Sequence, residues 1–202
     1  MHLPDQFAEY DQQVLIEFIR KQPFASLVHN AGDFLDACQV PLLMFTEGER
    51  VVLQGHVSRR NPIFRANTNS VLAIFSGQNH YISPGWYPHK SSDPKVVPTW
   101  NYQLVKAHGT IRCIDDPVWK RHNIEQLTDT HESGFENPWK VSDAPQDFIN
   151  RLLAAIVGIE IQVTKLEGIF KLSQNQADKT QRAVAAELQK LGSPLAREMR
   201  RK

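Results

Sequence analysis

Short apolar runs separated by turn-forming residues occupy the chain between Phe24 and Ile111, and this pattern constrains the fold most. The run Ala37–Phe45 is followed by Glu47-Gly48-Glu49 and then by the run Val51–His56, which is typical of a β-hairpin. Several short strands spaced closely by turns predict a barrel or a sandwich. Further strand candidates are Phe24–His29, Val71–Phe75, Tyr81–Ser83, Trp100–Ile111 and Ile159–Val163.

Helical signals flank and follow these runs, so the predicted fold class is mainly β with added helices, that is, α+β. Asp116 followed by Pro117 is typical of a helix N-terminus, because aspartate caps free N–H groups and proline suits the first helical position. With 202 residues the chain is long enough for one core, and we expect residues 1–202 to form a single domain. The helices are expected near residues 11–20, 117–128, 145–157 and 178–191.

Charge and cysteine content exclude several classes of protein. The formal net charge is +1, so phosphate binding requires a local basic cluster and not a global positive field. Cys38 and Cys113 are too few for a disulfide framework and lack metal-ligand spacing, and the eight histidines are scattered, so no metal site is predicted. The N-terminus has no signal-peptide pattern, and no apolar run approaches the roughly 18 residues of a membrane span. We therefore expect a cytoplasmic protein.

The segment His56–Pro62 is the first candidate for a binding site, with His56, Ser58, Arg59 and Arg60 as its polar members. Two adjacent guanidiniums, a hydroxyl and the N–H groups of a helix or turn start form a plausible phosphate cradle. Two solvated arginines on a turn are about as frequent an explanation of the same pattern.

The second candidate is the strand start that carries Trp100, Asn101 and Tyr102. An amide side chain suits the edge of a heterocycle, and an aromatic side chain can line the face of a flat ring. Two half-buried strand aromatics around an exposed asparagine are the competing interpretation.

The third candidate follows the strand that ends near Phe170 and comprises Lys171, Ser173, Gln174 and Asn175. This polar cluster is able to complete a phosphate or ring site, but a plain polar turn before the last helix explains it as well. The aromatic segment Tyr81–Tyr87 is a fourth feature, either an interface or pocket wall or ordinary core packing. No nucleophile elbow, Walker loop or GxGxxG fingerprint is present, so the catalytic residues stay unknown.

Taken together, these segments resemble the PaiB family. They occur in the family's order, from Leu53–His56 with Arg59–Pro62, through Tyr81–Tyr87 and Val97–Tyr102, to Lys171–Asn175. Blocks around His131-Glu132, Pro138-Trp139 and Ala155–Gly158 also match, so the resemblance extends from Met1 to about Leu191.

The resemblance implies an FMN-binding split β-barrel similar to pyridoxamine-phosphate oxidase, with the flavin at the interface of a homodimer. Ser58-Arg59-Arg60 is similar to the SRK-like segment that grips the flavin phosphate in this group, with arginine in place of lysine at the third position. By the same resemblance, Trp100, Asn101 and Tyr102 lie on the strand near the flavin. The block of Lys171, Ser173, Gln174 and Asn175 is inferred to line the same pocket.

The resemblance also implies a function. PaiB proteins are described as negative transcriptional regulators, so we expect an FMN-binding regulator or flavin-linked sensor, with DNA as a partner from resemblance alone. No helix-turn-helix pattern is visible, and the basic end with Arg197 and Arg200 also fits a solvated tail. The alternative is an FMN-dependent oxidoreductase acting on a small molecule. A barrel that has kept the fold without the flavin is a third possibility.

Overall fold

The computed structural model describes residues 4–48, 50–65, 69–90 and 94–200. Its strands form one sheet in the order β3-β2-β6-β7-β8-β5-β4, with β1 added beside β8. The strand bounds are β1 Ala8–Glu9, β2 Phe24–Asn30, β3 Leu35–Pro41, β4 Leu43–Glu47, β5 Arg50–Ser58, β6 Ser70–Ile82, β7 Thr99–Ile114 and β8 Ile156–Lys171. The helices are α1 Gln12–Lys21, α2 Pro117–Glu132, α3 Gln146–Ala154, α4 Asp178–Lys190 and α5 Leu195–Glu198, with 3-10 turns Asp5–Phe7, Pro62–Arg65, Pro84–Trp86 and Val141–Asp143.

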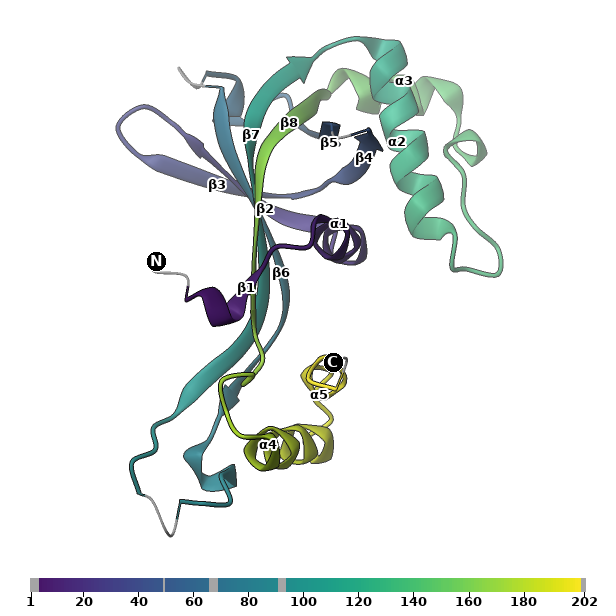
Figure 1. Cartoon of the computed structure of the whole chain (residues 1–202). Coiled ribbons are helices and arrows are strands. Elements are labelled where there is room, and N and C mark those ends of the chain that lie inside the picture. Colours follow the sequence, from purple (N-terminus) through teal and green to yellow (C-terminus); the bar gives the residue numbers. More distant parts are fainter. Residues whose placement is uncertain (1–3, 49, 66–68, 91–93, 201–202) are drawn as a thin grey trace. The chain divides into compact units, whose positions relative to one another are not determined.

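The chain divides into two compact units, and each is described by itself. Unit 1 comprises Met1–Leu15, Ser76–Val105 and Glu167–Lys202, and unit 2 comprises Ile16–Phe75 and Lys106–Leu166. The long strands β6, β7 and β8 contribute residues to both units (Figure 1).

In unit 2, strand β5 has one face buried in the core. Residues of β5 alternate between buried and half-buried positions, as a strand with one buried face should. The predicted hairpin is confirmed: β4 and β5 pair antiparallel, with Leu43 opposite Gln54. On its other side β5 pairs with β8, so that Gln54 lies opposite Glu160 and Ser58 opposite Ile156. The polar side chains that matter below therefore lie on the half-buried face of this ladder.

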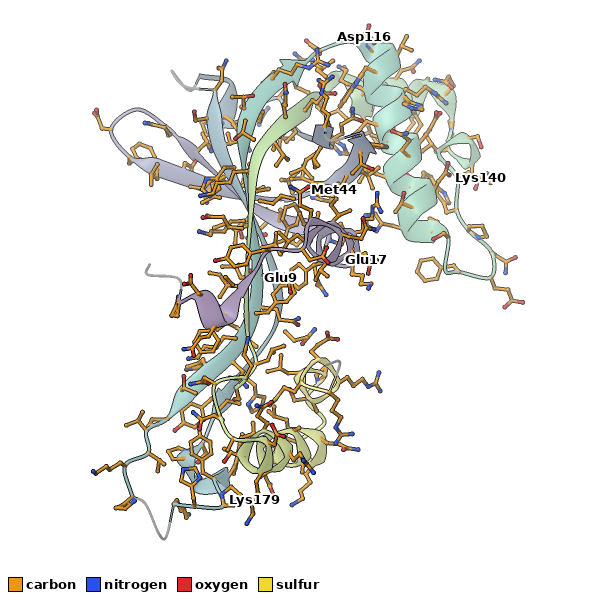
Figure 2. The ribbon with its side chains drawn as sticks, in the orientation of Figure 1. Glu9, Glu17, Met44, Asp116, Lys140 and Lys179 are labelled. Carbon is orange, nitrogen blue, oxygen red and sulfur yellow. The ribbon has the colours of Figure 1, made fainter. Side chains whose placement is uncertain are left out.

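Helix α2 begins as the sequence predicts. Asp116 lies at the start of the helix (Figure 2). Its carboxylate accepts a hydrogen bond from the Trp119 backbone N–H at 2.6 Å, and Pro117 occupies the first turn. The Trp119 ring lies so close to Gly158 of β8 that a Cβ there would come within 2.1 Å of it. This close approach brings the buried face of α2, with Lys120 and Asn123, against β5 and β8.

Unit 1 has a second, smaller core. Helices α4 and α5 contribute Val184, Leu188 and Leu195, which pack with Ile82 and Tyr87. The two helices lie side by side in Figure 1. This cluster fixes the C-terminal segment within unit 1, because burial of each such side chain stabilises it by roughly 1.5–3 kcal/mol.

Several boundaries differ from the sequence-based expectation. The run Ala37–Phe45, expected as the first strand of the hairpin, is divided into β3, which pairs with β2, and β4, which pairs with β5. The helix expected over residues 145–157 ends at Ala154, and Ile156 and Val157 belong to β8. Both are β-branched and pair with β5, with Val157 opposite Val57, so the ladder outweighs the helical apolar spacing. The strand expected at Val71–Phe75 continues without a break to Ile82 and forms the single strand β6, while Ser83, expected in a second strand, caps the turn Pro84–Trp86. The expected loop His89–Pro98 includes residues 91–93, which lie outside the described residues.

Candidate functional site

The two arginines at the end of β5 have different environments. Arg59 donates from Nη1 and Nη2 to the Asp115 carboxylate at 2.7 and 2.5 Å, and from Nε to the Ala154 carbonyl at 2.9 Å. A longer bond of 3.4 Å joins Nη2 to the Ile156 carbonyl. Four of its five N–H groups are thus used within the unit, and Arg59 has little left with which to grip a ligand.

Asp115 is the centre of this cluster. It also accepts from Lys120 Nζ at 2.8 Å, and the Lys120 side chain is only 4% exposed. The hydrogen bonds from Arg59 and Lys120 hold the pKa of Asp115 well below its usual range, and the same contact raises the pKa of Arg59. The cluster ties the end of β5 to the junction of α3 and β8, where the Ile156 carbonyl also accepts from Lys120 at 3.3 Å.

Both arginines are exposed, but the Arg60 guanidinium, unlike that of Arg59, has no bonding partner among the residues that the structure describes. Its backbone N–H donates to the Ser58 Oγ at 3.2 Å, which leaves the Ser58 hydroxyl proton available to a ligand. The short turn that follows, Pro62–Arg65, adds little, because Asn61 Oδ1 already accepts the Ile63 N–H at 3.0 Å. The usable donors of this segment are therefore the fork of N–H groups on the Arg60 guanidinium and the Ser58 hydroxyl.

His56 lies two residues before Ser58 on the same face of β5. Its Nδ1 is 3.2 Å from Oδ1 of Asn123 on α2. Asn123 is 1% exposed, and its Nδ2 has no partner within the described part of the chain. A buried amide donor without a partner is costly, so a ligand oxygen or a water that reached it would be stabilising.

In unit 1, strand alternation separates the three candidates at the start of β7. Trp100 and Tyr102 point to one face, where they line a shallow cleft of about 290 Å³ with Ser76, Gly77 and Asn79. Trp100 is 53% exposed and meets the ring of Tyr81 edge-on at 6.1 Å. Asn101 points to the opposite face and is fully buried. The two aromatic side chains and the Asn101 amide therefore do not form a single site, because they lie on opposite faces of β7.

The side chains of Asn101 and Ser173 are hydrogen-bonded to each other. Asn101 Nδ2 donates to Ser173 Oγ at 2.9 Å, and the reverse contact from Ser173 Oγ to Asn101 Oδ1 measures 3.2 Å. Met199 Sδ lies 3.7 Å from the same amide nitrogen. Since Asn101 is fully buried and Ser173 is 3% exposed, the pair serves the packing of unit 1.

The other members of the Lys171–Asn175 segment are also used locally. Lys171 Nζ donates to Thr99 Oγ1 at 2.5 Å and lies 5.7 Å from the centre of the Phe7 ring. Gln174 closes the turn, because its Oε1 accepts from the Leu172 N–H at 2.6 Å and its Nε2 donates to the Phe170 carbonyl at 2.5 Å. Ser173 has a φ of 63°, which suits such a tight turn. Asn175 alone is exposed.

The candidates therefore fall into two groups. His56, Ser58, Arg59 and Arg60 gather in unit 2, and the remaining seven lie in unit 1. Sequence reasoning missed Asp115, Lys120 and Asn123, all of which bond to members of the first group. The sequence does carry a signal for Asp115. Of the two aspartates before Pro117, only one is needed to cap the helix, so the other is free to bind a basic side chain.

The described residues contain no metal-ligand cluster and no membrane-spanning helix. No group of three or more His, Cys, Asp or Glu side chains there has the arrangement of a metal site. Among the helices of the described ranges, none has the length and apolar character needed to cross a bilayer.

The comparisons with known proteins identify the family. Residues 1–165 match the family model described as "Putative FMN-binding domain", and the chain belongs to this family. It is 28% identical over 204 residues to the Bacillus subtilis protein "Protease synthase and sporulation protein PAI 2", with 98% of this chain and 94% of that one covered. It is also 34% identical over 170 residues to the uncharacterized protein AN0679 of Emericella nidulans, covering 70% and 68% of the two chains. The predicted membership of the PaiB family is confirmed, and so is FMN as the cofactor.

Solved structures agree on the fold. The FAD and heme binding protein of Mycobacterium smegmatis superposes with a TM-score of 0.59 at 15% identity, covering 89% of this chain and 79% of that chain. The flavocytochrome Anf3 of Azotobacter vinelandii gives 0.55 at 15% identity, covering 84% and 72%. The predicted fold class, mainly antiparallel β with added helices in the manner of the flavin-binding split barrels, is confirmed.

Proposed function

We propose that the protein is an FMN-binding homodimer in the cytoplasm, in which Ser58 and Arg60 hold the flavin phosphate. The observation that carries this proposal is the contrast between Arg59, which is bound within the unit, and Arg60, whose fork is exposed. A guanidinium binds phosphate through two parallel charge-assisted hydrogen bonds, and the Ser58 hydroxyl adds a third donor. The residues at the end of β5 thus fit a phosphomonoester.

The other members of the first group hold these donors in place. Arg59 connects the end of β5 to Asp115 and to the Ala154 carbonyl, which fixes the backbone from which Arg60 projects. His56 and the unpartnered Asn123 amide lie further along the same face and offer further polar contacts. Bound FMN would supply one- or two-electron redox chemistry, and the protein would supply binding and orientation.

In unit 1, the cleft beside Trp100 and Tyr102 is a separate surface suited to a flat ring. Exposed aromatic side chains stack on heterocycles through offset or edge-on contacts. Asn101, Lys171, Ser173 and Gln174 have their polar groups engaged inside the unit, so in our proposal they support this surface from behind and do not touch the cofactor.

The biological role that we favour is a flavin-linked sensor that acts as a negative regulator of transcription. The Bacillus subtilis relative, "Protease synthase and sporulation protein PAI 2", has sporulation in its name, which is a cellular process and not a small-molecule reaction. An FMN-dependent oxidoreductase is the second candidate, because the aromatic cleft of about 290 Å³ is open enough for a small flat substrate.

Cofactor retention and DNA retention test these roles in turn. Purified protein is incubated with FMN, freed of unbound flavin and examined for the visible flavin band, with light scattering as the measure of the dimer. Promoter DNA is then titrated at low salt with oxidised and with reduced protein. A flavin band and redox-dependent DNA binding support the sensor. A flavin band without DNA binding, but with reduction by NADH, NADPH or a substrate, supports the oxidoreductase. A colourless monomer contradicts both.

A further inference from the structure

A polar cleft lies in unit 2, on the face of the sheet to which Ser58 belongs. It is further from the end of β5 than the segment Ser58–Arg60. It consists of two adjoining hollows of about 410 and 250 Å³, which share Arg50, Arg112 and Glu160. The larger hollow continues over β7 and β8, and the smaller over β4 and β5. The remaining walls combine neutral polar and apolar side chains: Thr46, Gln54, Asn69, Thr110 and Gln162 with Phe45, Val52 and Ile111.

Glu160 is the buried centre of this cleft. It is 8% exposed and lies opposite Gln54 in the ladder of β5 and β8. Its carboxylate accepts from Arg112 Nε at 2.7 Å and from Gln54 Nε2 at 2.8 Å. Burial acts to raise the pKa of Glu160, but these donors outweigh it and hold the pKa below its ordinary value. The carboxylate is therefore charged at neutral pH.

The Arg112 guanidinium is held by one edge. Its Nε binds Glu160, while its side chain remains 68% exposed. Its two Nη groups have no hydrogen-bonding partner in the described ranges, and four N–H donors are left to face the cleft. Arg50 adds a second positive charge to the same walls. Two cations against one carboxylate leave the cleft with a net charge of +1 in a protein of formal net charge +1.

From this geometry we propose that the cleft binds a small molecule bearing an oxyanion, a phosphate or a carboxylate, with Arg112 as its anchor and Glu160 as a positioning residue. A fork held by one edge loses less side-chain entropy on binding than a free arginine. The cleft is distinct from the segment Ser58–Arg60, since Gln54 and Ser58 are four residues apart on one strand, or about 13 Å. The inference does not depend on how FMN is used.

The test is calorimetric titration of the full chain with inorganic phosphate and with succinate, at ionic strength held constant with chloride. We expect saturable binding of at least one of them, and the one that binds defines the class. Arg112→Lys should weaken this binding about tenfold, because lysine keeps the charge but loses the fork. Arg20→Ala, an exposed arginine of the same unit, is the matched control and should leave it unchanged.

Glu160→Gln tests whether Glu160 acts by orienting Arg112 or only by changing the net charge of the cleft. If Glu160 orients Arg112, this variant binds the oxyanion more weakly even though the cleft has become more positive. If the cleft is only a positive surface, the same variant binds more tightly, which overturns the proposal. It is equally overturned if neither anion binds, if Arg112→Lys binds like the wild type, or if Arg60→Ala rather than Arg112→Lys abolishes phosphate binding.

Discussion

Two polar segments that look alike in the sequence differ in where their hydrogen bonds go. In Ser58–Arg60 of unit 2, Arg59 is bound to Asp115, whereas the Arg60 guanidinium has no partner in the described part of the chain. In Lys171–Gln174 of unit 1, the lysine, the serine and the glutamine all bond to neighbouring groups of the unit. The first segment therefore keeps hydrogen-bond donors for a ligand. In the second, most of the polar groups are engaged in hydrogen bonds within the unit.

The comparison shows that residue type alone does not mark a binding site. A polar side chain contributes to binding only if its donors or acceptors are left unsatisfied by the fold. Burial separates the two cases here, because Asn101 and Ser173 are almost completely enclosed, whereas Arg60 is exposed. Substitutions in each segment test this separation.

Asn101→Ala should destabilise the protein without affecting FMN. The substitution leaves the buried Ser173 hydroxyl without its partner, and we expect unfolding in urea to become easier by about 1–3 kcal/mol. The FMN dissociation constant of the folded variant should stay at the wild-type value. In Asn101→Ala/Ser173→Ala the loss should be smaller than the sum of the single losses, because both polar partners are gone. A loss of FMN affinity at full stability would reverse the roles given to the two segments.

Arg60→Ala should have the opposite effect, that is, weaker FMN binding at unchanged stability. Removal of the exposed fork should weaken FMN binding about tenfold or more, since hydrogen bonds to charged groups contribute roughly 1.5–3 kcal/mol. The free energy of unfolding without flavin should change by less than about 0.5 kcal/mol, as is usual for exposed positions. Flavin fluorescence quenching gives the first quantity and urea denaturation the second, with Arg20→Ala as the matched control.

The sequence predicted most of the strand-forming segments, the cap of α2 and the family, because turn spacing, Asp116-Pro117 and the ordered motifs are local signals. It did not predict β1, the division between β3 and β4, or the continuity of β6. It did not predict that Arg59 and Arg60 differ, because that difference depends on Asp115, which is 56 residues away in the chain. It also joined Trp100 and Asn101 into one site, although the alternation of β7 places them on opposite faces. That separation follows from a local pattern, whereas the separation of Arg59 from Arg60 depends on a contact between distant segments.

Asp115→Asn should lower stability in a pH-dependent way. The folded-state pKa of Asp115 is depressed, so its contribution is complete above the unfolded-state value of about 3.9 and is lost as the pH falls through the folded-state pKa. The variant should therefore be less stable than the wild type at pH 7, and the gap should narrow as the pH falls below about 4. Urea denaturation over this pH range measures the gap.

Asp147→Asn is the control for this series, because Asp147 pairs with Arg151 on an exposed helix surface. Its effect at pH 7 should be no more than about 1 kcal/mol. If the gap between Asp115→Asn and the wild type is the same at every pH, the ion cluster at the end of β5 does not have the role described.

Asn175→Ala should have the smallest effect. Asn175 is the exposed member of the Lys171–Asn175 segment, and its substitution should change the free energy of unfolding by less than about 0.5 kcal/mol. A tenfold loss of FMN affinity in this variant would place the cofactor at the turn after β8, contrary to our assignment.

The most direct test of the central claim compares FMN with riboflavin, which lacks the phosphate. Both are titrated into the wild type, Arg60→Ala and Asn101→Ala, and the ratio of the two dissociation constants is taken for each protein. The account predicts that the wild type and Asn101→Ala prefer FMN by about tenfold or more, and that Arg60→Ala loses this preference while its riboflavin affinity is unchanged. An unchanged preference in Arg60→Ala, or its loss in Asn101→Ala, would contradict the claim that the exposed arginine at the end of β5 holds the phosphate.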